Sequence, residues 1–425
     1  MMTKRRINDN THQCDMPEDI IMNEILVWLP VSSLLRFKSV CKSWYSLIQS
    51  SEFVSKHLLH HHYHHPTSED DFFITLTPEG KALLFPRNAN GTESSENYNL
   101  SDIPHPYEKD DEDEELMIPA SFNGIIFLYD QDRLGSQHSY LWNPATKQCR
   151  LLPHKKWPQN LSVFDRFSIQ FAIGFDDKTN DYKVVRLVIV HEYRSNNRKI
   201  NNDCQLDIYS LTTDSWSARE DVVLPVVPVR RIIDSIKTPF HNGKYFCWLG
   251  EIDQTEENFT NIIISFDFSN DVLGTMPLPE SVICSYNKCL PMNTNMTIAT
   301  LRDKLVCIDR LRDSLGDSFD IWILNEFGVK ESWNKLYTIG KFQILDYYGW
   351  YYWLRGIPNN QELIFELRDE KIRLCNPITG TCQVLNNIRL PNQCLLSLMF
   401  KESLVSIQTH NVIHTHNTDC TTCEL

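Results

Sequence analysis

The chain has 425 residues and a formal net charge of −14, and hydrophobic and aromatic residues make up 42% and 11% of it. This length exceeds one ordinary domain of roughly 100–200 residues, and the apolar content excludes an intrinsically disordered protein. No apolar run approaches the ~20 residues that span a bilayer, and residues 1–15 lack the apolar stretch of a secretory signal. We therefore expect no membrane contact and a cytoplasmic chain, with the nucleus as a second compartment.

The negative charge is concentrated behind the N-terminal region. Residues 1–65 carry seven Lys/Arg and six Asp/Glu; of 41 basic and 55 acidic residues in all, 34 and 49 remain, which leaves the body at −15. Such a body argues against nucleic-acid binding, because that binding relies on Lys and Arg at phosphates. It fits either a basic protein partner or solubility alone. The 13 cysteines show no disulfide-framework spacing, so we interpret most as small buried thiols of a reducing compartment.

The first 60 residues carry helical signals. Pro17 and the two acidic residues after it predict a helix start, and this helix is expected to end at Pro30. Ser32 is expected to cap a second, short helix. A third helix is predicted from about Val40 into the histidine-rich stretch 57–65, which we interpret as a solvated helix end.

From about Phe72 the sequence changes to short apolar runs bounded by turn residues, which is typical of strands. Asn123-Gly124 and Asn242-Gly243 lie between such runs, and Asn-Gly supplies the positive φ of a tight type I′ hairpin. Both pairs therefore predict hairpins.

The strand runs recur, and a ~50-residue period of short strands predicts kelch-like blades of a β-propeller. The repeats start at Phe72, Tyr140, Leu206, Ile263, Phe319 and Ile372. Six blades are expected, or seven if a long gap hides one, and the apolar run 395–407 is expected to close the ring. The predicted fold class is α+β and multidomain: a small N-terminal three-helix unit followed by an all-β propeller.

The N-terminal block resembles the F-box family. The matching residues are Met16-Pro17-Glu18-Asp19-Ile20 and the run 24–44, which ends in Arg-Phe-Lys-Ser-Val-Cys-Lys-Ser-Trp. Met16 stands where the family usually has Leu, a volume-conserving exchange. The resemblance implies that the helices bind a Skp-type adaptor, which connects to the cullin and RING subunits of a ubiquitin ligase.

The adaptor-binding surface implied by this resemblance is apolar. A unit this small hides little apolar area by itself, so we expect some of its residues to form its own core and others to face the partner. Residues 29–35 are the best candidates for the interface, and Trp44 could serve either role. The predicted adaptor-binding residues are Pro17, Ile20, Ile25, Leu26, Leu29, Pro30, Leu34, Leu35, Val40, Cys41 and Trp44.

The rest of the chain is similar to the plant F-box-associated domain. Residues 143–146 with 151–153, and residues 171–177 with 179–186, carry the likeness. Within that group it looks most like the S-locus F-box proteins, on residues 209–216, 328–339 and 401–404. This likeness implies a plant origin, a role in pollen self-incompatibility and a non-self S-locus ribonuclease as client. An unrelated client, such as an immune receptor or another plant protein, stays open, as does a propeller scaffold without a ligase role.

The most acidic stretch, residues 102–115, holds eight acidic residues and one basic residue. A block of like charge predicts a solvated loop, and the alternative is a surface that steers a basic client. The candidate client-binding residues are Asp110, Asp111, Glu112, Asp113, Glu114 and Glu115.

Other chemistry-bearing residues are discounted. The tail carries His410, His414, His416, Cys420 and Cys423, but the spacing is irregular and no second Cys pair follows, so no metal site is expected. We interpret Asp176-Asp177 as a turn. No hydrolase, P-loop or dinucleotide motif is found, so we expect a non-catalytic receptor subunit without a cofactor.

These signals predict five segments. They are a disordered N-terminus (1–14), an F-box (15–60), a linker (61–71), an F-box-associated propeller (72–409) and a flexible tail (410–425).

Overall fold

The chain was analysed as a computed structural model, which separates into two compact units, Met1–Ser68 and Glu69–Leu425. The structure describes residues 20, 24–64, 71–76, 82–86, 115–131, 138–155, 166–191, 204–219, 229–253, 259–279, 282, 296–301, 303–313, 316–342, 353–356, 363–366, 371–375, 382–389 and 398–408. Each unit is presented by itself.

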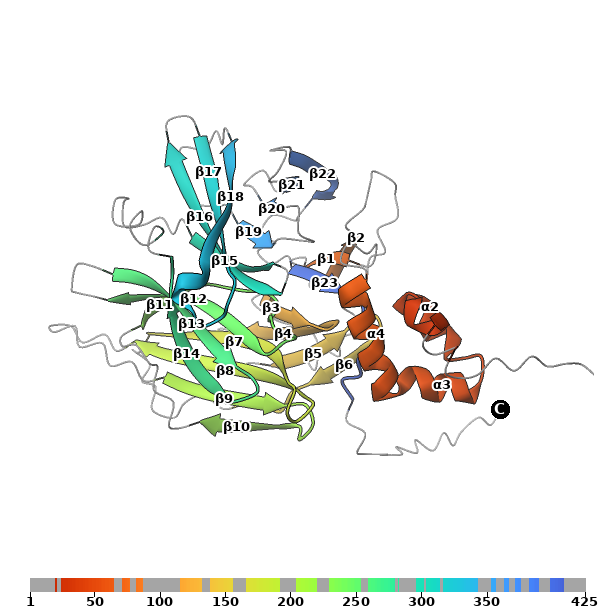
Figure 1. The fold of residues 1–425 in the computed structure, drawn as a ribbon. Coiled ribbons are helices and arrows are strands. Elements are labelled where there is room, and N and C mark those ends of the chain that lie inside the picture. Colours follow the sequence, from red (N-terminus) through yellow and green to blue (C-terminus); the bar gives the residue numbers. More distant parts are fainter. Residues whose placement is uncertain are drawn as a thin grey trace, which may run out of the picture. The chain divides into compact units, whose positions relative to one another are not determined.

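The first unit is helical (Figure 1). Its described elements are the 3-10 helix η2 (Leu26–Trp28) and the helices α2 (Val31–Phe37), α3 (Lys42–Gln49) and α4 (Ser51–His64). Most of the helix expected to start at Pro17 lies outside the described residues. Pro30 does separate two helical segments, since its extended backbone precedes α2 and its carbonyl accepts from the N–H groups of Ser33 and Leu34.

Two local predictions in this unit are wrong. Ser32 lies inside α2, where Pro30 takes the cap position without a side-chain bond. The predicted third helix is two helices, because Ser50 is extended (φ −66°, ψ 140°). The Ser50 hydroxyl donates to the carbonyl of Leu47 at 2.8 Å and accepts from the N–H of Phe53 at 3.2 Å. It therefore closes α3 and caps α4.

His57 is not part of a solvated helix end. Its side chain is 2% exposed, and its Nε2 lies 2.9 Å from the carbonyl oxygen of Leu29. A backbone carbonyl can only accept, so Nε2 donates. The bond joins α4 to the segment between η2 and α2, which makes His57 a core residue of this unit.

Apart from the short 3-10 helix η4 (Lys330–Ser332) and the helical residue Val282, the described secondary structure of the second unit consists of strands. The strands are β1 (Asp71–Leu76), β2 (Ala82–Pro86), β3 (Glu115–Phe122), β4 (Ile125–Gln131), β5 (Ser139–Asn143), β6 (Gln148–Leu151), β7 (Arg166–Asp176), β8 (Asp181–His191), β9 (Cys204–Ser210), β10 (Ser215–Arg219), β11 (Val229–Ser235), β12 (Tyr245–Asp253), β13 (Phe259–Asp267), β14 (Val272–Pro277), β15 (Met296–Leu301), β16 (Lys304–Asp313), β17 (Gly316–Leu324), β18 (Trp333–Phe342), β19 (Trp353–Gly356), β20 (Leu363–Glu366), β21 (Lys371–Cys375), β22 (Cys382–Arg389) and β23 (Leu398–Lys401).

The described strands form six antiparallel sheets around a ring (Figure 1). Five have four strands in sequence order, and one joins β23 to β1 and β2. The inner strands contact one another in turn, from β3 through β7, β11, β15 and β19 to β23, and β23 contacts β3 again. Each of the six repeat starts lies in a different sheet. The pairing of β23 with β1 joins the two ends of the propeller sequence, as expected of the run 395–407.

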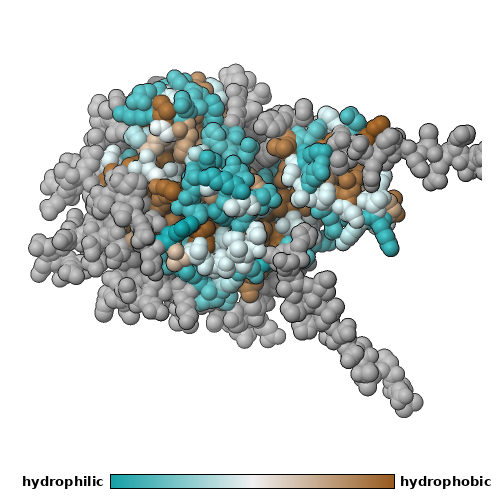
Figure 2. Space-filling model, turned by 60° about the horizontal axis from the view of Figure 1, so that its bottom comes forward, coloured by the Kyte–Doolittle hydropathy of each residue, from teal (hydrophilic) through white to brown (hydrophobic). Residues whose placement is uncertain are grey.

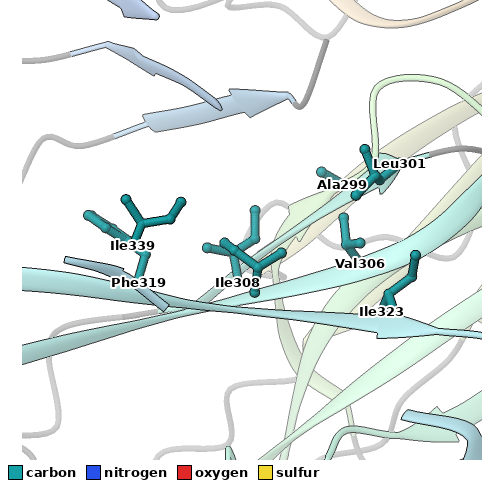
Figure 3. Packing of buried hydrophobic residues seen from close by; sticks show 8 residues of the cluster. Ala299, Leu301, Val306, Ile308, Phe319, Ile323 and Ile339 are labelled. Carbon is teal, nitrogen blue, oxygen red and sulfur yellow. The ribbon is translucent and has the colours of Figure 1, made fainter. Parts of the chain in front are cut away.

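The sheet β15–β18 buries apolar residues of neighbouring strands together. Ala299, Val306 and Ile323 are cross-strand neighbours, and so are Ile308 and Ile321. Figure 3 shows the labelled side chains of this cluster on one face of the sheet, and its eight members are at most 8% exposed. Burying an Ile or Leu side chain stabilises the fold by about 1.5–3 kcal/mol. Apolar side chains at alternating positions of the strands therefore stabilise the ring.

The two ends of the ring differ in their connections. At the end we call the turn end, short turns join β3 to β4, β7 to β8, β9 to β10 and β13 to β14. Longer segments precede the strands that begin at the opposite end, which we call the loop end. Three of them precede the inner strand of a sheet (87–114, 152–165 and 278–295), and one precedes the third strand β9 (192–203). Asn123 (φ 48°) and Gly124 (φ 74°) form the expected two-residue hairpin.

The second Asn-Gly prediction needs a correction. Phe240 and Tyr245 form an isolated bridge, so the turn around Asn242-Gly243 has four residues instead of two. His241 and Asn242 both have positive φ and Gly243 has φ 87°. A side chain at Gly243 would meet the ring of Phe122, at the end of β3, at 2.4 Å, so this close approach also requires glycine there.

The outer surface mixes hydrophilic and hydrophobic residues on the face drawn in Figure 2, as is usual for a globular protein. Among the helices of the described residues, none combines the length and apolar character needed to cross a bilayer.

Candidate functional site

The helical unit has a small core of its own. Its buried apolar side chains come from η2, α2, α3 and α4, and they are Leu26, Val27, Val31, Leu34, Ile48 and Phe53. The ring of Phe53 lies 6.0 Å from that of His57. Such a short unit cannot enclose every apolar side chain, so the remaining ones form the candidate adaptor surface.

The predicted adaptor-binding residues divide by exposure. Leu26 and Leu34 are fully buried inside the unit and therefore act as its core. Three are half-buried, namely Leu29, Leu35 and Trp44, and five are exposed, namely Ile20, Ile25, Pro30, Val40 and Cys41. Pro17 lies outside the described residues. The structure thus separates core from surface where the sequence alone left the two mixed.

Trp44 has both of the roles that its sequence position allowed. It is half-buried on α3, and its ring lies 5.4 Å from the ring of Phe37 on α2. The pair fastens α3 to α2, while part of the indole remains at the surface. We count Trp44 as the edge of the candidate surface.

Three exposed apolar residues were missed by the sequence analysis. They are Trp28, Tyr45 and Leu59, each about half exposed. The ring of Trp28 packs on that of His60 at 3.8 Å, which links η2 to α4. Tyr45 follows Trp44 by one position, so the helical period of α3 places it on another side. That period is the signal that could have identified Tyr45.

Basic side chains border the exposed apolar residues. Arg36 on α2, Lys38 in the following turn and Lys42 at the start of α3 flank Val40 and Cys41 in the chain. Arg36 and Lys42 are exposed, and burial lowers the pKa of Lys38. A cationic border around an apolar centre fits an acidic partner surface through charge complementarity.

The candidate client-binding segment is described only at its last residue. Glu115 begins β3 at the loop end of the propeller, and Asp110–Glu114 lie outside the described residues. The tail residues 410–423, with their His and Cys, lie outside them as well. Within the part of the chain that the structure describes, no group of three or more His, Cys, Asp or Glu could hold a metal ion.

Asp176-Asp177 forms the predicted turn between β7 and β8. The carboxylate of Asp176 accepts from the backbone N–H of Lys178 and from the hydroxyl of Thr179, and it pairs with Lys183 at 2.8 Å. Burial raises the pKa of Asp176, but these donors outweigh burial and hold it below its usual value. The ionised carboxylate is thereby committed to the turn.

Lys183 extends this network to the next sheet. Its ammonium pairs with Asp271 at 2.8 Å and donates to the carbonyl of Phe268 at 3.1 Å. Arg219 pairs with the other oxygen of Asp271 at 2.7 Å. These bonds join the sheet β7–β10 to the sheet β11–β14 at the turn end, so the network holds two blades together.

A second buried pair lies deeper in the same sheet. Arg186 on β8 donates through Nε and Nη2 to Asp207 on β9, at 3.1 and 2.8 Å. Lys155, which follows β6 of the previous sheet, pairs with the other carboxylate oxygen at 2.9 Å. Asp207 is fully buried and Arg186 is 2% exposed. Through Lys155, the Arg186–Asp207 pair is therefore connected to the neighbouring blade.

Four of the described thiols are poor nucleophiles. Burial raises the pKa of Cys149 and Cys204 to about 12, and it also raises the pKa of Cys247 and Cys307 well above the usual value of a thiol. A thiol with a raised pKa carries little thiolate at neutral pH. Cys247 and Cys307 are small buried side chains, whereas Cys149 and Cys204 are half-buried.

Comparison with known proteins agrees with this arrangement. Residues 88–407 match the F-box associated beta propeller domain, and residues 14–56 match the F-box domain. The chain belongs to the F-box-associated beta-propeller family. The first match covers five of the six sheets, and the second covers η2, α2, α3 and the start of α4.

Similar curated proteins come from Arabidopsis thaliana. F-box/kelch-repeat protein At3g23880 is 27% identical over 351 residues, covering 78% of this chain and 83% of the relative. F-box protein At4g22390 is 26% identical over 333 residues, with 77% and 74% covered. F-box protein CPR1 is 23% identical over 374 residues, with 84% and 81% covered.

Proposed function

We propose that this chain is the substrate-recognition subunit of a Skp–cullin–F-box ubiquitin ligase. In this role the helical unit binds a Skp-type adaptor, and through it the cullin and RING subunits, while the propeller binds a protein client. Support comes from the F-box match at residues 14–56, followed by the propeller match at residues 88–407. The observation that carries the proposal is the exposed apolar surface of the helical unit, which includes Ile25, Val40 and Cys41.

The proposed chemistry requires no acid, base or nucleophile from this chain. A receptor that holds client and adaptor together raises the effective concentration of the charged conjugating enzyme near the client's lysines. The carboxylates and thiols described above are occupied by structural bonds or disfavoured as ions by burial. We therefore propose a non-catalytic receptor that needs no cofactor.

Adaptor capture tests the proposal. Leu29→Ala combined with Pro30→Ala removes two residues of the candidate surface, and we expect it to abolish co-purification with a recombinant Skp-type adaptor. The propeller should keep its unfolding midpoint, since the changes lie in the other unit. Ser55→Ala, an exposed change on α4, is the matched control. Undiminished capture of the double variant would contradict the interface.

We further propose that the client binds at the loop end and that residues 110–115 steer a basic client toward it. Glu115 starts β3 at that end, and the body of the chain carries −15. Neutralising Asp110–Glu115 should lower the association rate with the client at low salt and leave it nearly unchanged at high salt. A rate that ignores both the substitutions and the salt would exclude steering.

The preferred client is a non-self S-locus ribonuclease, as implied by residues 209–216, 328–339 and 401–404. Affinity capture from native tissue with mass spectrometry of adaptor and client tests this identity. A ribonuclease recovered from pollen together with the adaptor would support it. Adaptor recovered with an unrelated client would keep the ligase role and exclude self-incompatibility, and recovery without adaptor would favour a plain propeller scaffold.

A further inference from the structure

The turn between α2 and α3 exposes a hydroxyl among basic side chains. Ser39 is exposed, and its hydroxyl donates to the carbonyl of Arg36 at 2.7 Å. Arg36 precedes it by three positions, the spacing at which basophilic kinases read arginine, and is itself exposed. Ser39 also adjoins Val40, which is 61% exposed and is the most exposed large apolar residue described.

The cations around this turn are available to an anion. Arg36 donates its Nε to the carbonyl of Ser32 at 3.3 Å, which leaves its terminal nitrogens for other acceptors. Among the described residues, no carboxylate forms an ion pair with Arg36, Lys38 or Lys42. A phosphate group carries about −1.5 to −2 charge near neutral pH and pairs strongly with such side chains.

We propose that Ser39 is a phosphorylation site for a basophilic serine kinase and that the phosphate blocks adaptor docking. The inference rests on the proposed function. The Ser39 hydroxyl attacks the γ-phosphorus of ATP, the bond from that phosphorus to the β-phosphate oxygen breaks, ADP leaves, and the hydroxyl proton is released. The product has a phosphate ester in place of the hydroxyl.

Two physical effects connect the phosphate to docking. The new dianion lies beside Val40 and Cys41, and burying it against an apolar partner surface would remove its water. It also pairs with the basic side chains that would otherwise attract an acidic adaptor. Both effects oppose docking.

The test treats the full-length protein with ATP and the catalytic subunit of a basophilic serine kinase, then maps the phosphate by mass spectrometry. We expect Ser39 to be modified and the affinity for a recombinant Skp-type adaptor, measured by calorimetry, to fall about tenfold or more. Adaptor bound beforehand should slow phosphorylation of Ser39. Ser39→Ala should take no phosphate there and bind the adaptor as the parent does.

Matched variants separate the causes. Ser39→Asp should weaken adaptor binding, and Ser55→Asp, which adds the same charge at an exposed position of α4, should not. Phosphate placed elsewhere, or phosphorylated protein that binds the adaptor as tightly as before, would overturn the inference while leaving the proposed function intact. Failure of the unmodified protein to bind any adaptor would instead overturn the proposed function, and this inference with it.

Discussion

Among the described residues, the helical unit leaves more large apolar side chains exposed than the propeller does. Of the nine large hydrophobic residues that are exposed in the described part of the chain, six belong to the helical unit and three to the much larger propeller. The six are Ile20, Ile25, Trp28, Val40, Tyr45 and Leu59, and the three are Leu151, Val272 and Leu336. In a closed ring, each sheet covers the apolar face of the next, whereas a few short helices retain apolar surface that a partner can cover.

The largest effect is expected from a substitution that forces two sheets of the propeller apart. A Cβ at Gly174 would lie 2.2 Å from the ring of Phe268 and 2.6 Å from the carbonyl oxygen of Gly243. Gly174→Ala should therefore lower the unfolding free energy of the propeller by about 4 kcal/mol or more. Urea unfolding followed by tryptophan fluorescence measures the loss.

Gly328→Ala is the matched control. This glycine has φ 90°, but a Cβ there would meet nothing within 4 Å, so only the backbone cost of about 1–2 kcal/mol is expected. Equal losses for the two variants would show that close approach between sheets does not decide the effect.

The second-largest effect concerns Asp207, whose carboxylate pairs with Arg186 of its own sheet and with Lys155, which follows the previous sheet. Asp207→Asn removes the charge that Arg186 and Lys155 share in a site without solvent, and we expect a loss of about 3–5 kcal/mol in unfolding free energy. Asp214→Asn breaks the pair with Arg150, but the Asp214 side chain is 48% exposed, so that loss should stay below about 1 kcal/mol. Thermal unfolding of both variants tests whether burial sets the difference.

The third-largest effect is expected at an exposed valine of the helical unit and not at its counterpart in the propeller. Val40→Asp and Val272→Asp place the same charge at similarly exposed valines, one in each unit. Both should change stability by less than about 0.5 kcal/mol. Only Val40→Asp should weaken adaptor binding, by about 2 kcal/mol or some 30-fold, as measured by calorimetry. Equal affinities would assign the adaptor surface elsewhere.

A smaller effect is expected from a contact that recurs between blades. Trp216 on β10 donates its Nε1–H to the carbonyl of Pro153 at 2.8 Å, and Trp333 on β18 donates to the carbonyl of Pro277 at 3.3 Å. Trp216→Phe keeps a ring but removes the donor, which should lower stability by about 1 kcal/mol. Trp333→Phe should cost less because its bond is longer. The reverse order in thermal unfolding would contradict this geometry.

The last effect is a loss of stability that occurs only at acidic pH. The folded-state pKa of Asp176 is held below its ordinary value, so its contribution to stability is present above the unfolded pKa of about 3.9 and is lost as pH falls through the folded pKa. Lys183 has a raised pKa, since its bonds to Asp176 and Asp271 outweigh burial. Its contribution is lost only as pH rises through that raised pKa. Unfolding midpoints from pH 7 to pH 2 should fall less steeply for Asp176→Asn than for the parent.

Short-range sequence patterns predicted much of this fold. The alternating strand runs, the period of the six repeat starts, the Asn123-Gly124 hairpin and the Asp176-Asp177 turn all depend on residues close in the chain. Their geometry follows from local backbone preferences and from the two-residue period of a strand. The apolar character of the helical unit was predictable for the same reason, whereas its role as an adaptor surface stays a prediction.

The failures have a common physical origin. Ser50 ends one helix and begins another because its hydroxyl bonds to both, although the apolar spacing continues across it. His57 is buried because the carbonyl of Leu29, 28 positions away, needs a donor. The turn at Asn242-Gly243 has four residues, and Phe122, more than 100 positions away, leaves no room for a side chain at Gly243. In each case a partner overrode the local pattern.

By itself, then, the sequence determined the two kinds of unit, the register of repeats and the list of apolar residues in the helical unit. Only the tertiary structure decided which of those residues are core, as with Leu26 and Leu34, and which remain outside, as with Val40, Trp28 and Tyr45. Helical period selects a face of each helix, but whether that face lies inside depends on where the other helices pack. That packing is why the candidate adaptor surface loses Leu26 and Leu34 and gains Trp28, Tyr45 and Leu59 relative to the sequence prediction.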